Sequence, residues 1–195
     1  MTERDAYIQK LEAEQREATA RFREIEAQAD LADNEEALDT LTGVREFNDD
    51  VNRELQALRH ADQRDWDRLK DGAEKARRRL HERLDRADTH FGQLREGYRR
   101  QREAELKELG AQLDGWIASH QQSRAEDSLL TREELDFLTR GMKNAREMLQ
   151  NLRHSRGHVW KTARDQYEAN WRELVERSRR IRAEGSPEAQ GASPS

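Results

Sequence analysis

The sequence contains no cysteine and only 2 prolines in 195 residues. Without cysteine the chain forms no disulfide, carries no thiol nucleophile and offers no thiolate ligand to zinc. Both prolines, Pro187 and Pro194, lie in the last stretch of the chain. Nothing before them therefore carries the residue that most strongly interrupts a helix.

Apolar residues are also scarce, at 33% of the chain against 39% charged residues. A typical globular domain is closer to half apolar and a quarter charged, so we expect narrow seams between helices in place of a broad core. No apolar run approaches the roughly 20 residues that cross a membrane. The first residues lack the apolar core of a secretory signal, and we expect a cytoplasmic location.

The chain has no excess of positive charge, since 36 basic residues face 41 acidic ones for a formal net charge of −5. Nucleic-acid binding draws its affinity from neutralising phosphates with Lys and Arg. A nucleic acid is therefore an unfavoured partner, although a coiled coil that binds DNA stays as a weak third hypothesis.

The apolar residues that are present recur in steps of three and four from about residue 37 to residue 120, which places them on one face of a helix. We predict one long central helix over 37–120, softened but unbroken at residues 92–97 despite Gly92 and Gly97. The face is formed by Leu41, Val44, Val51, Leu55, Leu58, Trp66, Leu69, Ala73, Ala76, Leu80, Leu84, Ala87, Phe91, Leu94, Tyr98, Leu106, Leu109, Leu113 and Trp116.

A first helix is predicted from Thr2 to about Ala32, because Thr2 and Asp5 have the spacing of a capping box and a heptad seam follows them. The turn signal Asp33-Asn34 then folds the chain back. In an antiparallel hairpin, the seam of the first helix meets that of residues 41–58, and Ala18 falls beside Asn48.

A last helix is predicted from the capping pattern at Thr131 to about Ala183. Folding it back antiparallel places Met142 by Leu109 and Ile181 opposite Leu69. The predicted class is thus all-α, an elongated antiparallel coiled coil or bundle of two hairpins. Its parts are hairpin units 1–91 and 92–184 and a disordered tail 185–195.

The two units are similar to each other. A shift of 94 aligns Trp66 with Trp160 and the triplet Leu58-Arg59-His60 with Leu152-Arg153-His154, and a shift of 91 aligns Tyr7 with Tyr98. Shared periodicity accounts for matching apolar stripes but not for these residues. We interpret the pattern as a duplicated helical unit, which is typical of architectural proteins.

The blocks Arg4-Asp5-Ala6-Tyr7-Ile8-Gln9-Lys10-Leu11 and Asp65-Trp66-Asp67-Arg68-Leu69-Lys70-Asp71-Gly72-Ala73-Glu74-Lys75-Ala76 resemble a family of small bacterial and cyanobacterial coiled-coil proteins associated with stress response. The resemblance covers residues 1–91, and residues 92–184 follow as a degenerate second copy. It implies a helical protein without catalytic residues.

Two groups of residues raise the question of a ligand site. His154 and His158 have the i, i+4 spacing of metal ligands, with His90 as a third candidate. We expect surface histidines and no metal. The four tryptophans are Trp66, Trp116, Trp160 and Trp171. Tryptophans can anchor a protein to a membrane or line a ligand site, but we expect these four to pack in the core. Trp171 lies one step off the predicted seam.

Charged groups form several clusters. The basic clusters could bind anionic lipid or phosphate, or they could form a solvated, ion-paired helix face. We expect the solvated, ion-paired face. The paired carboxylates Glu35-Glu36 and Asp49-Asp50 require a pocket to become catalytic, and a narrow seam offers none. No catalytic, cofactor or metal residue is predicted. The basic clusters are Arg77-Arg78-Arg79, Arg99-Arg100 with Arg102, and Arg177 with Arg179, Arg180 and Arg182.

Polar residues interrupt the seam, which costs stability but specifies the alignment or the oligomeric state of a coiled coil. We therefore expect a homo-oligomer, first of all a dimer. The main hypothesis is a non-enzymatic scaffold, and the alternative is an amphipathic coat on lipid or granule surfaces. The polar seam residues are Gln15, Asn48, Asp62, Arg102, Arg156, Asn170 and Ser178.

Overall fold

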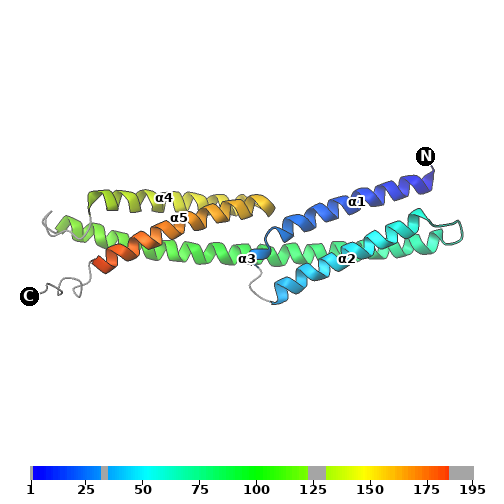
Figure 1. Cartoon of the computed structure of the whole chain (residues 1–195), viewed down its shortest axis with the longest axis horizontal. Helices are drawn as coiled ribbons and strands as arrows, with labels where there is room; N and C mark the ends of the chain where they lie inside the picture. The colour runs from blue at the N-terminus through cyan, green and yellow to red at the C-terminus, as the bar shows by residue number, and fades with distance from the viewer. Residues whose placement is uncertain (1, 32–34, 123–130, 185–195) are drawn as a thin grey trace, which may run out of the picture. The chain divides into compact units, whose positions relative to one another are not determined.

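The computed structural model describes residues 2–31, 35–122 and 131–184. These residues form five α-helices and one short 3-10 helix, without a β-strand among them, which confirms the all-α class and a helical bundle (Figure 1). In chain order the elements are α1 (Glu3–Glu26), η1 (Ala29–Leu31), α2 (Glu35–Arg59), α3 (Trp66–Gln122), α4 (Arg132–His154) and α5 (Gly157–Glu184).

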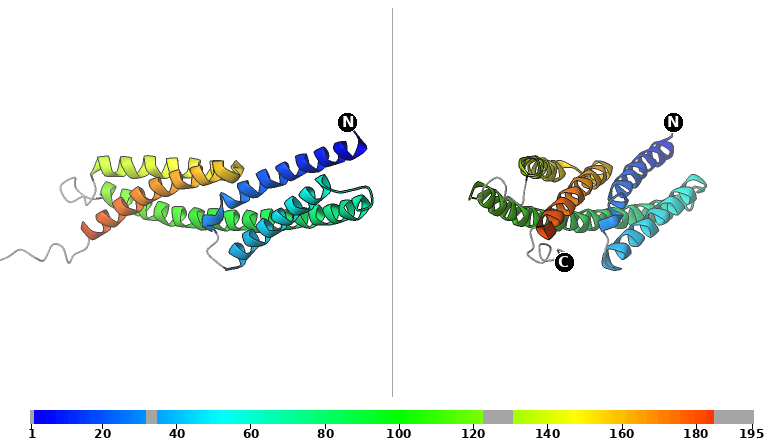
Figure 2. Two further views of the ribbon diagram at one scale, coloured as in Figure 1. Left: turned by 45° about the vertical axis from the view of Figure 1, so that its right-hand side comes forward. Right: turned by 60° about the vertical axis from the view of Figure 1, so that its left-hand side comes forward.

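The chain divides into two compact units. Unit 1 comprises residues 1–95 and 156–158, and unit 2 comprises residues 96–155 and 159–195. Helix α3 contributes to both, so each unit contains three helical segments. In unit 1, α1 and α2 lie along the first part of α3, and in unit 2, α4 and α5 lie along its last part (Figure 2).

The predicted helix starts are confirmed at both capping boxes. The Thr2 hydroxyl accepts from the Asp5 backbone N–H at 3.2 Å, and the Asp5 carboxylate accepts from the Thr2 N–H at 2.8 Å. Thr131 and Glu134 form the same reciprocal pair at α4. Backbone N–H groups at a helix N-terminus lack partners within the helix, and each capping box supplies acceptors for two of them. The predicted turn at residues 33–34, the break over 123–130 and the tail 185–195 lie outside the described residues.

In unit 1, α1 and α2 are antiparallel, as predicted. Glu12 pairs with Arg59 near one end of the hairpin and Glu26 pairs with Arg45 near the other. The core between the three segments contains buried residues that the periodicity identified, from Leu11, Ala18, Phe22 and Ile25 of α1 through Leu41, Val44, Val51, Leu55 and Leu58 of α2 to Ala73, Ala76, Leu80, Leu84, Ala87 and Phe91 of α3.

The prediction of one helix over 37–120 was wrong between His60 and Asp65. Helix α2 ends at Arg59 and α3 begins at Trp66. The carboxylate of Asp62 accepts from the backbone N–H groups of Arg64 and Asp65, each at 2.9 Å. Asp competes with helix geometry through such local bonds. Asp62 was a polar member of the seam because the chain turns there.

The reversal at this turn makes the first half of α3 parallel to α1. Arg21 of α1 forms ion pairs with Asp85 and Asp88 of α3. Unit 1 is thus a three-helix arrangement and not the predicted two-helix hairpin. The apolar residues of α3 from Leu69 to Phe91 belong to one core with those of α1 and α2.

The predicted last helix, from 131 to 183, was also wrong at one point. It is divided at Ser155 and Arg156 into α4 and α5. Ser155 is extended, with φ −88° and ψ 149°, and Gly157 has φ +52°, a conformation that residues other than glycine rarely adopt. Arg156, like Asp62 in unit 1, is a polar residue at a position where the predicted seam calls for an apolar one.

Helix α5 consequently runs parallel to the second half of α3. Tyr98 lies by Glu168, and Gln112 accepts a hydrogen bond from Arg182 at 2.6 Å, so the residue numbers rise together along both helices. The predicted approach of Ile181 to Leu69 was therefore wrong. Helix α4 runs antiparallel to α3, since Met142 lies beside Gly110 while Leu149, further along α4, lines a pocket with the earlier Leu106 of α3. The first contact is close to the predicted pairing of Met142 with Leu109.

Helix α3 itself is continuous for 57 residues and passes through Gly92 and Gly97, which confirms the prediction for residues 92–97. The described helices include none long and apolar enough to cross a membrane. In unit 2 the buried apolar side chains are Leu106, Leu109, Leu113, Leu138, Met142, Ala145, Leu149, Leu152, Trp160, Tyr167, Trp171, Leu174 and Ile181.

Candidate functional site

A tyrosine, a tryptophan and a glutamate form a cluster in unit 1. The rings of Tyr7 and Trp66 meet edge to face, with centroids 5.9 Å apart and planes at 77°. The Tyr7 hydroxyl donates to the carboxylate of Glu74 at 3.1 Å. Arg4 lies over the Trp66 ring at 4.2 Å, where the ring face attracts a cation. The cluster joins α1 to the start of α3.

The same three residue types form a cluster in unit 2. Tyr98 and Trp160 meet edge to face at 5.8 Å and 77°, and the Tyr98 hydroxyl donates to Glu168 at 2.5 Å. Arg164 lies over Trp160 at 5.5 Å. This cluster joins the second half of α3 to α5. We refer to the two as the Tyr–Trp–Glu clusters.

Both phenols are held in the neutral form. Burial, followed by the hydrogen bond to Glu74, raises the pKa of Tyr7 to about 12. Burial and the contact with Glu168 raise the pKa of Tyr98 still further above its ordinary value. A neutral phenol that donates to a carboxylate is a structural clamp at physiological pH, and its hydroxyl is a poor acid or nucleophile.

An ionic network surrounds the cluster of unit 2. Arg102 contacts Glu168 at 2.9 Å and Glu105 at 2.5 Å. Burial alone lowers the pKa of Arg102, but the hydrogen bonds and charges of Glu105, Tyr98 and Glu168 outweigh it and raise the pKa. Arg102 was expected as a polar interruption of the seam. Its charge is compensated from α3 and from α5.

Two further aromatic residues extend this cluster along α5. Tyr167 and Trp171 stack with planes 9° apart and centroids at 6.2 Å. The Tyr167 side chain is fully buried, and its hydroxyl has no hydrogen-bond partner among the described residues. Burial raises its pKa. An enclosed phenol of this kind contributes packing, not chemistry.

The tryptophans therefore lie mainly in the helix interfaces. Trp160 is 2% exposed and Trp171 is 9% exposed, whereas Trp66 and Trp116 are half-buried. Trp171, predicted one step off the seam, is part of the core because the break at residues 155–156 changes the face that α5 presents. The burial favours the core-packing interpretation over an exposed aromatic box.

The candidate histidines are not arranged as one ligand set. The break separates His154, the last residue of α4, from His158 in the first turn of α5, and their predicted spacing on one helix is lost. The buried Nε2 of His90 has no hydrogen-bond partner among the described residues. Within that part of the chain there is no group of three potential His, Asp or Glu ligands close enough to hold a metal.

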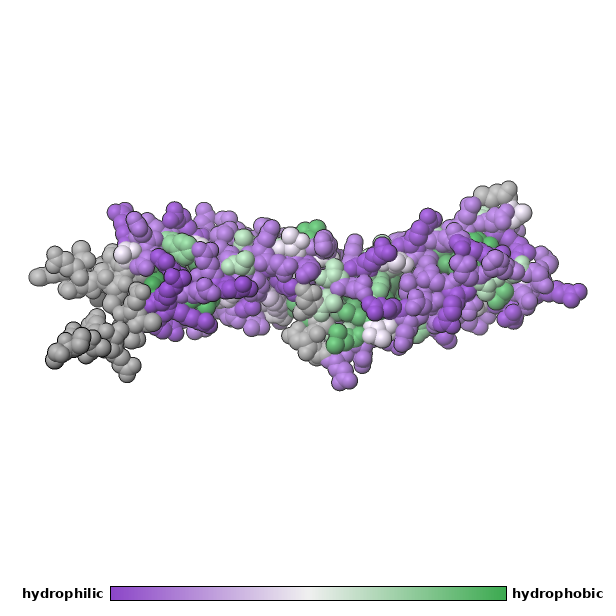
Figure 3. Space-filling view, viewed as in Figure 1, coloured by the Kyte–Doolittle hydropathy of each residue, from purple (hydrophilic) through white to green (hydrophobic). Residues whose placement is uncertain are grey.

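The surface in this view is mostly hydrophilic (Figure 3), and several side chains of the basic clusters are ion-paired. Arg77 pairs with Glu14 across helices at 2.9 Å, and Arg99 pairs with Glu96 and Glu103 along its own helix. Arg177 pairs with Glu134. Arg78, Arg79, Arg179 and Arg180 are exposed. The pattern favours a solvated, interlaced face.

One polar interruption of the seam is a partly buried hydrogen-bonded layer in unit 1, in which Gln15 is buried. The amide of Gln15 donates to the Asn48 side-chain oxygen at 2.7 Å, and Thr19 donates to the same oxygen at 3.1 Å. Asn48 lies beside α1 close to the predicted position opposite Ala18. The layer holds α1 and α2 in one alignment, since sliding either helix leaves these groups unpaired.

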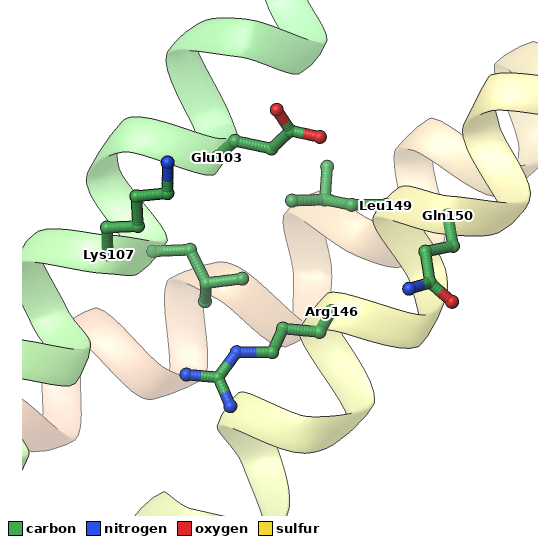
Figure 4. Close-up of a pocket in the computed structure, with 6 residues that line it drawn as sticks. Glu103, Lys107, Arg146, Leu149 and Gln150 are labelled. Atoms are coloured by element: carbon green, nitrogen blue, oxygen red, sulfur yellow. The ribbon is translucent and has the colours of Figure 1, made fainter.

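An open pocket of about 240 Å³ lies between α3 and α4 of unit 2, where sequence analysis expected none. Arg146 extends from α4 toward α3, and Leu149 points between the two helices (Figure 4). We call this pocket the α3–α4 groove. It is lined by Glu103, Leu106, Lys107, Arg146, Leu149 and Gln150.

The groove combines an apolar floor with a charged rim. Leu106 and Leu149 form the floor, and Lys107 and Arg146 stand exposed on opposite helices. Neither cation has an ion-pair partner in the described part of the chain, whereas Glu103 is paired with Arg99. An apolar floor between two cations is chemically complementary to an apolar side chain with acidic neighbours.

Comparison with known protein families, with curated proteins and with solved structures found no match to this chain.

Proposed function

We propose that this chain is a non-enzymatic coiled-coil scaffold, built from a duplicated helical unit, that acts by self-association and by protein–protein contacts. The observation that carries the proposal is the pair of Tyr–Trp–Glu clusters, which have nearly the same ring geometry in the two units. The stress-related role rests on the resemblance of residues 1–91 and stays a prediction.

The clusters support duplication because three separate residues coincide. Tyr7 corresponds to Tyr98 at a shift of 91, while Trp66 corresponds to Trp160 and Glu74 to Glu168 at a shift of 94. The glutamate pair was not used in the sequence alignment. Periodicity alone does not place a hydrogen-bonded glutamate at the same point of both units.

A difference between the two units in how one carboxylate is paired also supports the duplication. At a shift of 94, Arg77 corresponds to Trp171, so the ion pair of Arg77 with Glu14 has no direct counterpart in unit 2. At the shift of 91 that aligns Tyr7 with Tyr98, Glu14 corresponds to Glu105, which pairs instead with Arg102. Each unit thus keeps a cation for the equivalent carboxylate, from another helix in unit 1 and from the same helix in unit 2.

A repeated unit that buries its aromatic groups in helix interfaces supports an architectural role. The tyrosines with raised pKa values serve as clamps, and the catalytic carboxylates considered at Glu35-Glu36 and Asp49-Asp50 lie on helix surfaces. The scaffold is preferred to the lipid-coat alternative because Trp160 and Trp171, the anchors that a lipid surface needs, are buried.

Sedimentation velocity over a dilution series of the full chain tests the proposal. A scaffold that self-associates gives a weight-average mass that rises with concentration above the monomer value of 22.9 kDa. A chain that stays monomeric throughout, and that binds anionic vesicles in flotation, contradicts the scaffold and supports the lipid coat. A chain that is monomeric and binds no vesicles contradicts self-association.

A further inference from the structure

We propose that the α3–α4 groove of one copy receives the outer face of α2 from a second copy, with Leu38 on the leucine floor of the groove. The inference rests on the proposed self-association and adds the two surfaces that meet. They are different surfaces of the chain, so the contact is heterologous and each copy carries both halves of it.

Leu38 is the first reason for the choice of partner. It is 54% exposed, although it is a large apolar residue in the first half of α2. Only one other large hydrophobic side chain in the described residues is comparably exposed, Val159. An exposed leucine on a helix is the kind of knob that fits a hole formed by other helices.

The shape of the groove matches such a knob. Its lining residues have the spacing i, i+3, i+4 on each helix, namely 103, 106 and 107 on α3 and 146, 149 and 150 on α4. Residues at this spacing are neighbours on one helix face, and a hole in a coiled coil is lined in the same way. A helix laid along the groove therefore presents its knob to Leu106 and Leu149.

The charges around Leu38 complement those of the groove. The spacing in α2 places four acidic residues on the same face as Leu38, and none of them has an ion-pair partner among the described residues. Arg45 borders this face and is held by Glu26. We call this face the α2 acidic face. It consists of Glu35, Leu38, Asp39, Thr42, Glu46 and Asp49.

The net charges of the two halves of the chain also favour this contact, because the half that contains α2 is the more acidic one. Residues 1–95 contain 24 acidic and 18 basic side chains, a formal charge of −6, whereas residues 96–195 contain 17 acidic and 18 basic ones, a formal charge of +1. The unpaired Lys107 and Arg146 flank the groove. Attraction between copies thus favours contact of unit 1 with unit 2 over contact between two copies of unit 1.

Charge reversal on each surface tests the contact. One variant carries Asp39→Lys and Glu46→Lys, which lie beyond the first turn of α2, and the other carries Lys107→Glu and Arg146→Glu. Each alone is expected to self-associate about 100-fold more weakly in sedimentation velocity, because like charges then face each other. The matched controls Glu17→Lys and Arg172→Glu reverse exposed, unpaired charges elsewhere and are expected to leave association unchanged.

Mixing the two variants gives the decisive result. The groove of the first variant and the α2 acidic face of the second are both unaltered, so the mixture is expected to associate more strongly than either variant does alone. An interface between identical surfaces does not predict this recovery. Circular dichroism of each variant, expected to match the unaltered chain, separates a lost contact from a lost fold.

Removal of the knob gives an independent reading. Leu38→Ser is expected to weaken association about tenfold, as for an interface residue at the centre of a contact. Val159→Ser removes the other exposed hydrophobic side chain and is expected to have no effect. Equal effects of the two substitutions overturn the assignment of Leu38.

The outcomes separate this inference from the proposed function. If the unaltered chain associates and the reversed variants associate equally well, the inference is wrong and self-association stands through another surface. If the unaltered chain is monomeric at every concentration, both fail. Association that weakens when salt is raised supports the charged contact, since salt screens exposed charges.

Discussion

The hydroxyl of Tyr98 and the carboxylate of Glu168 lie 2.5 Å apart and join two parallel helices of unit 2. Tyr7 and Glu74 do the same in unit 1 at 3.1 Å. In each cluster the phenol keeps its proton, because burial and the adjacent carboxylate disfavour the phenolate. Single residues therefore link the stability of both units to pH.

The first prediction concerns Tyr7 at alkaline pH. Its pKa is 10.0 when unperturbed and about 12 in the folded chain, so the unfolded state loses its proton first. The contribution to stability is complete below pH 10 and is lost as the pH rises to about 12. Urea unfolding across this window is expected to show a smaller loss of stability in Tyr7→Phe than in the unaltered chain. Equal losses contradict the prediction.

The second prediction concerns the partly buried layer of Gln15 and Asn48. Asn48→Leu leaves the Gln15 amide without its partner and is expected to lower the free energy of unfolding by about 1–3 kcal/mol. Replacing both residues by Leu removes the unpaired amide and is expected to recover most of that loss. The measurement is a double-mutant cycle by urea unfolding. Additive effects of the two substitutions contradict a direct coupling.

The helices differ in how closely their neighbours approach, and two glycines show it. Gly97 lies inside α3, and a methyl group at its Cβ position has nothing within 4 Å. Gly141 lies inside α4, and the same methyl group stands 2.4 Å from Cδ2 of Leu174. Glycine at 141 is thus required by the packing of α5 on α4. Glycine at 97 is not required by packing and lowers the stability of α3.

The third prediction is an opposite response of these two positions. Gly97→Ala is expected to raise the free energy of unfolding by about 0.5–1 kcal/mol, since alanine is the better helix former. Gly141→Ala forces Leu174 to move and is expected to lower it by about 1–3 kcal/mol. Thermal unfolding checks both. A loss of stability in Gly97→Ala contradicts a continuous α3 at that point.

The whole molecule is two compact units that draw on one continuous helix, since α3 supplies a segment to each. Helix formation is cooperative, and fraying of one part lowers the stability of the next. The surface that both units expose is mostly charged. The proposed contact between copies joins Leu38, an exposed apolar side chain among acidic ones, to a groove that Lys107 and Arg146 flank.

The fourth prediction is that the shared helix couples the units. Leu174 is 1% exposed in unit 2, and Leu174→Ala is expected to lower stability by about 2–5 kcal/mol. Hydrogen exchange followed by mass spectrometry is expected to show faster exchange in α1 as well as in α4. Faster exchange confined to α4 and α5 indicates that the units unfold independently.

The all-α class, the two capping boxes, the α1–α2 hairpin and most core residues were predictable, because each follows from spacing along the chain or from a contact within one helical turn. The breaks at residues 60–65 and 155–156 were missed. In both places the three-and-four spacing of apolar residues continued through the break with one polar residue in the seam, Asp62 or Arg156. Periodicity does not distinguish a polar residue within a helix from a turn between helices.

Helix direction and contacts across helices were decided by the tertiary structure. Once the chain turns at those two points, the third segment of each unit lies parallel to the first, which brings Tyr7 to Glu74 and Tyr98 to Glu168. The α3–α4 groove also depends on tertiary structure, since α4 lies antiparallel along α3 and brings together residues about forty positions apart. Local spacing specifies which face of a helix is apolar, but the partner of that face depends on where the chain reverses.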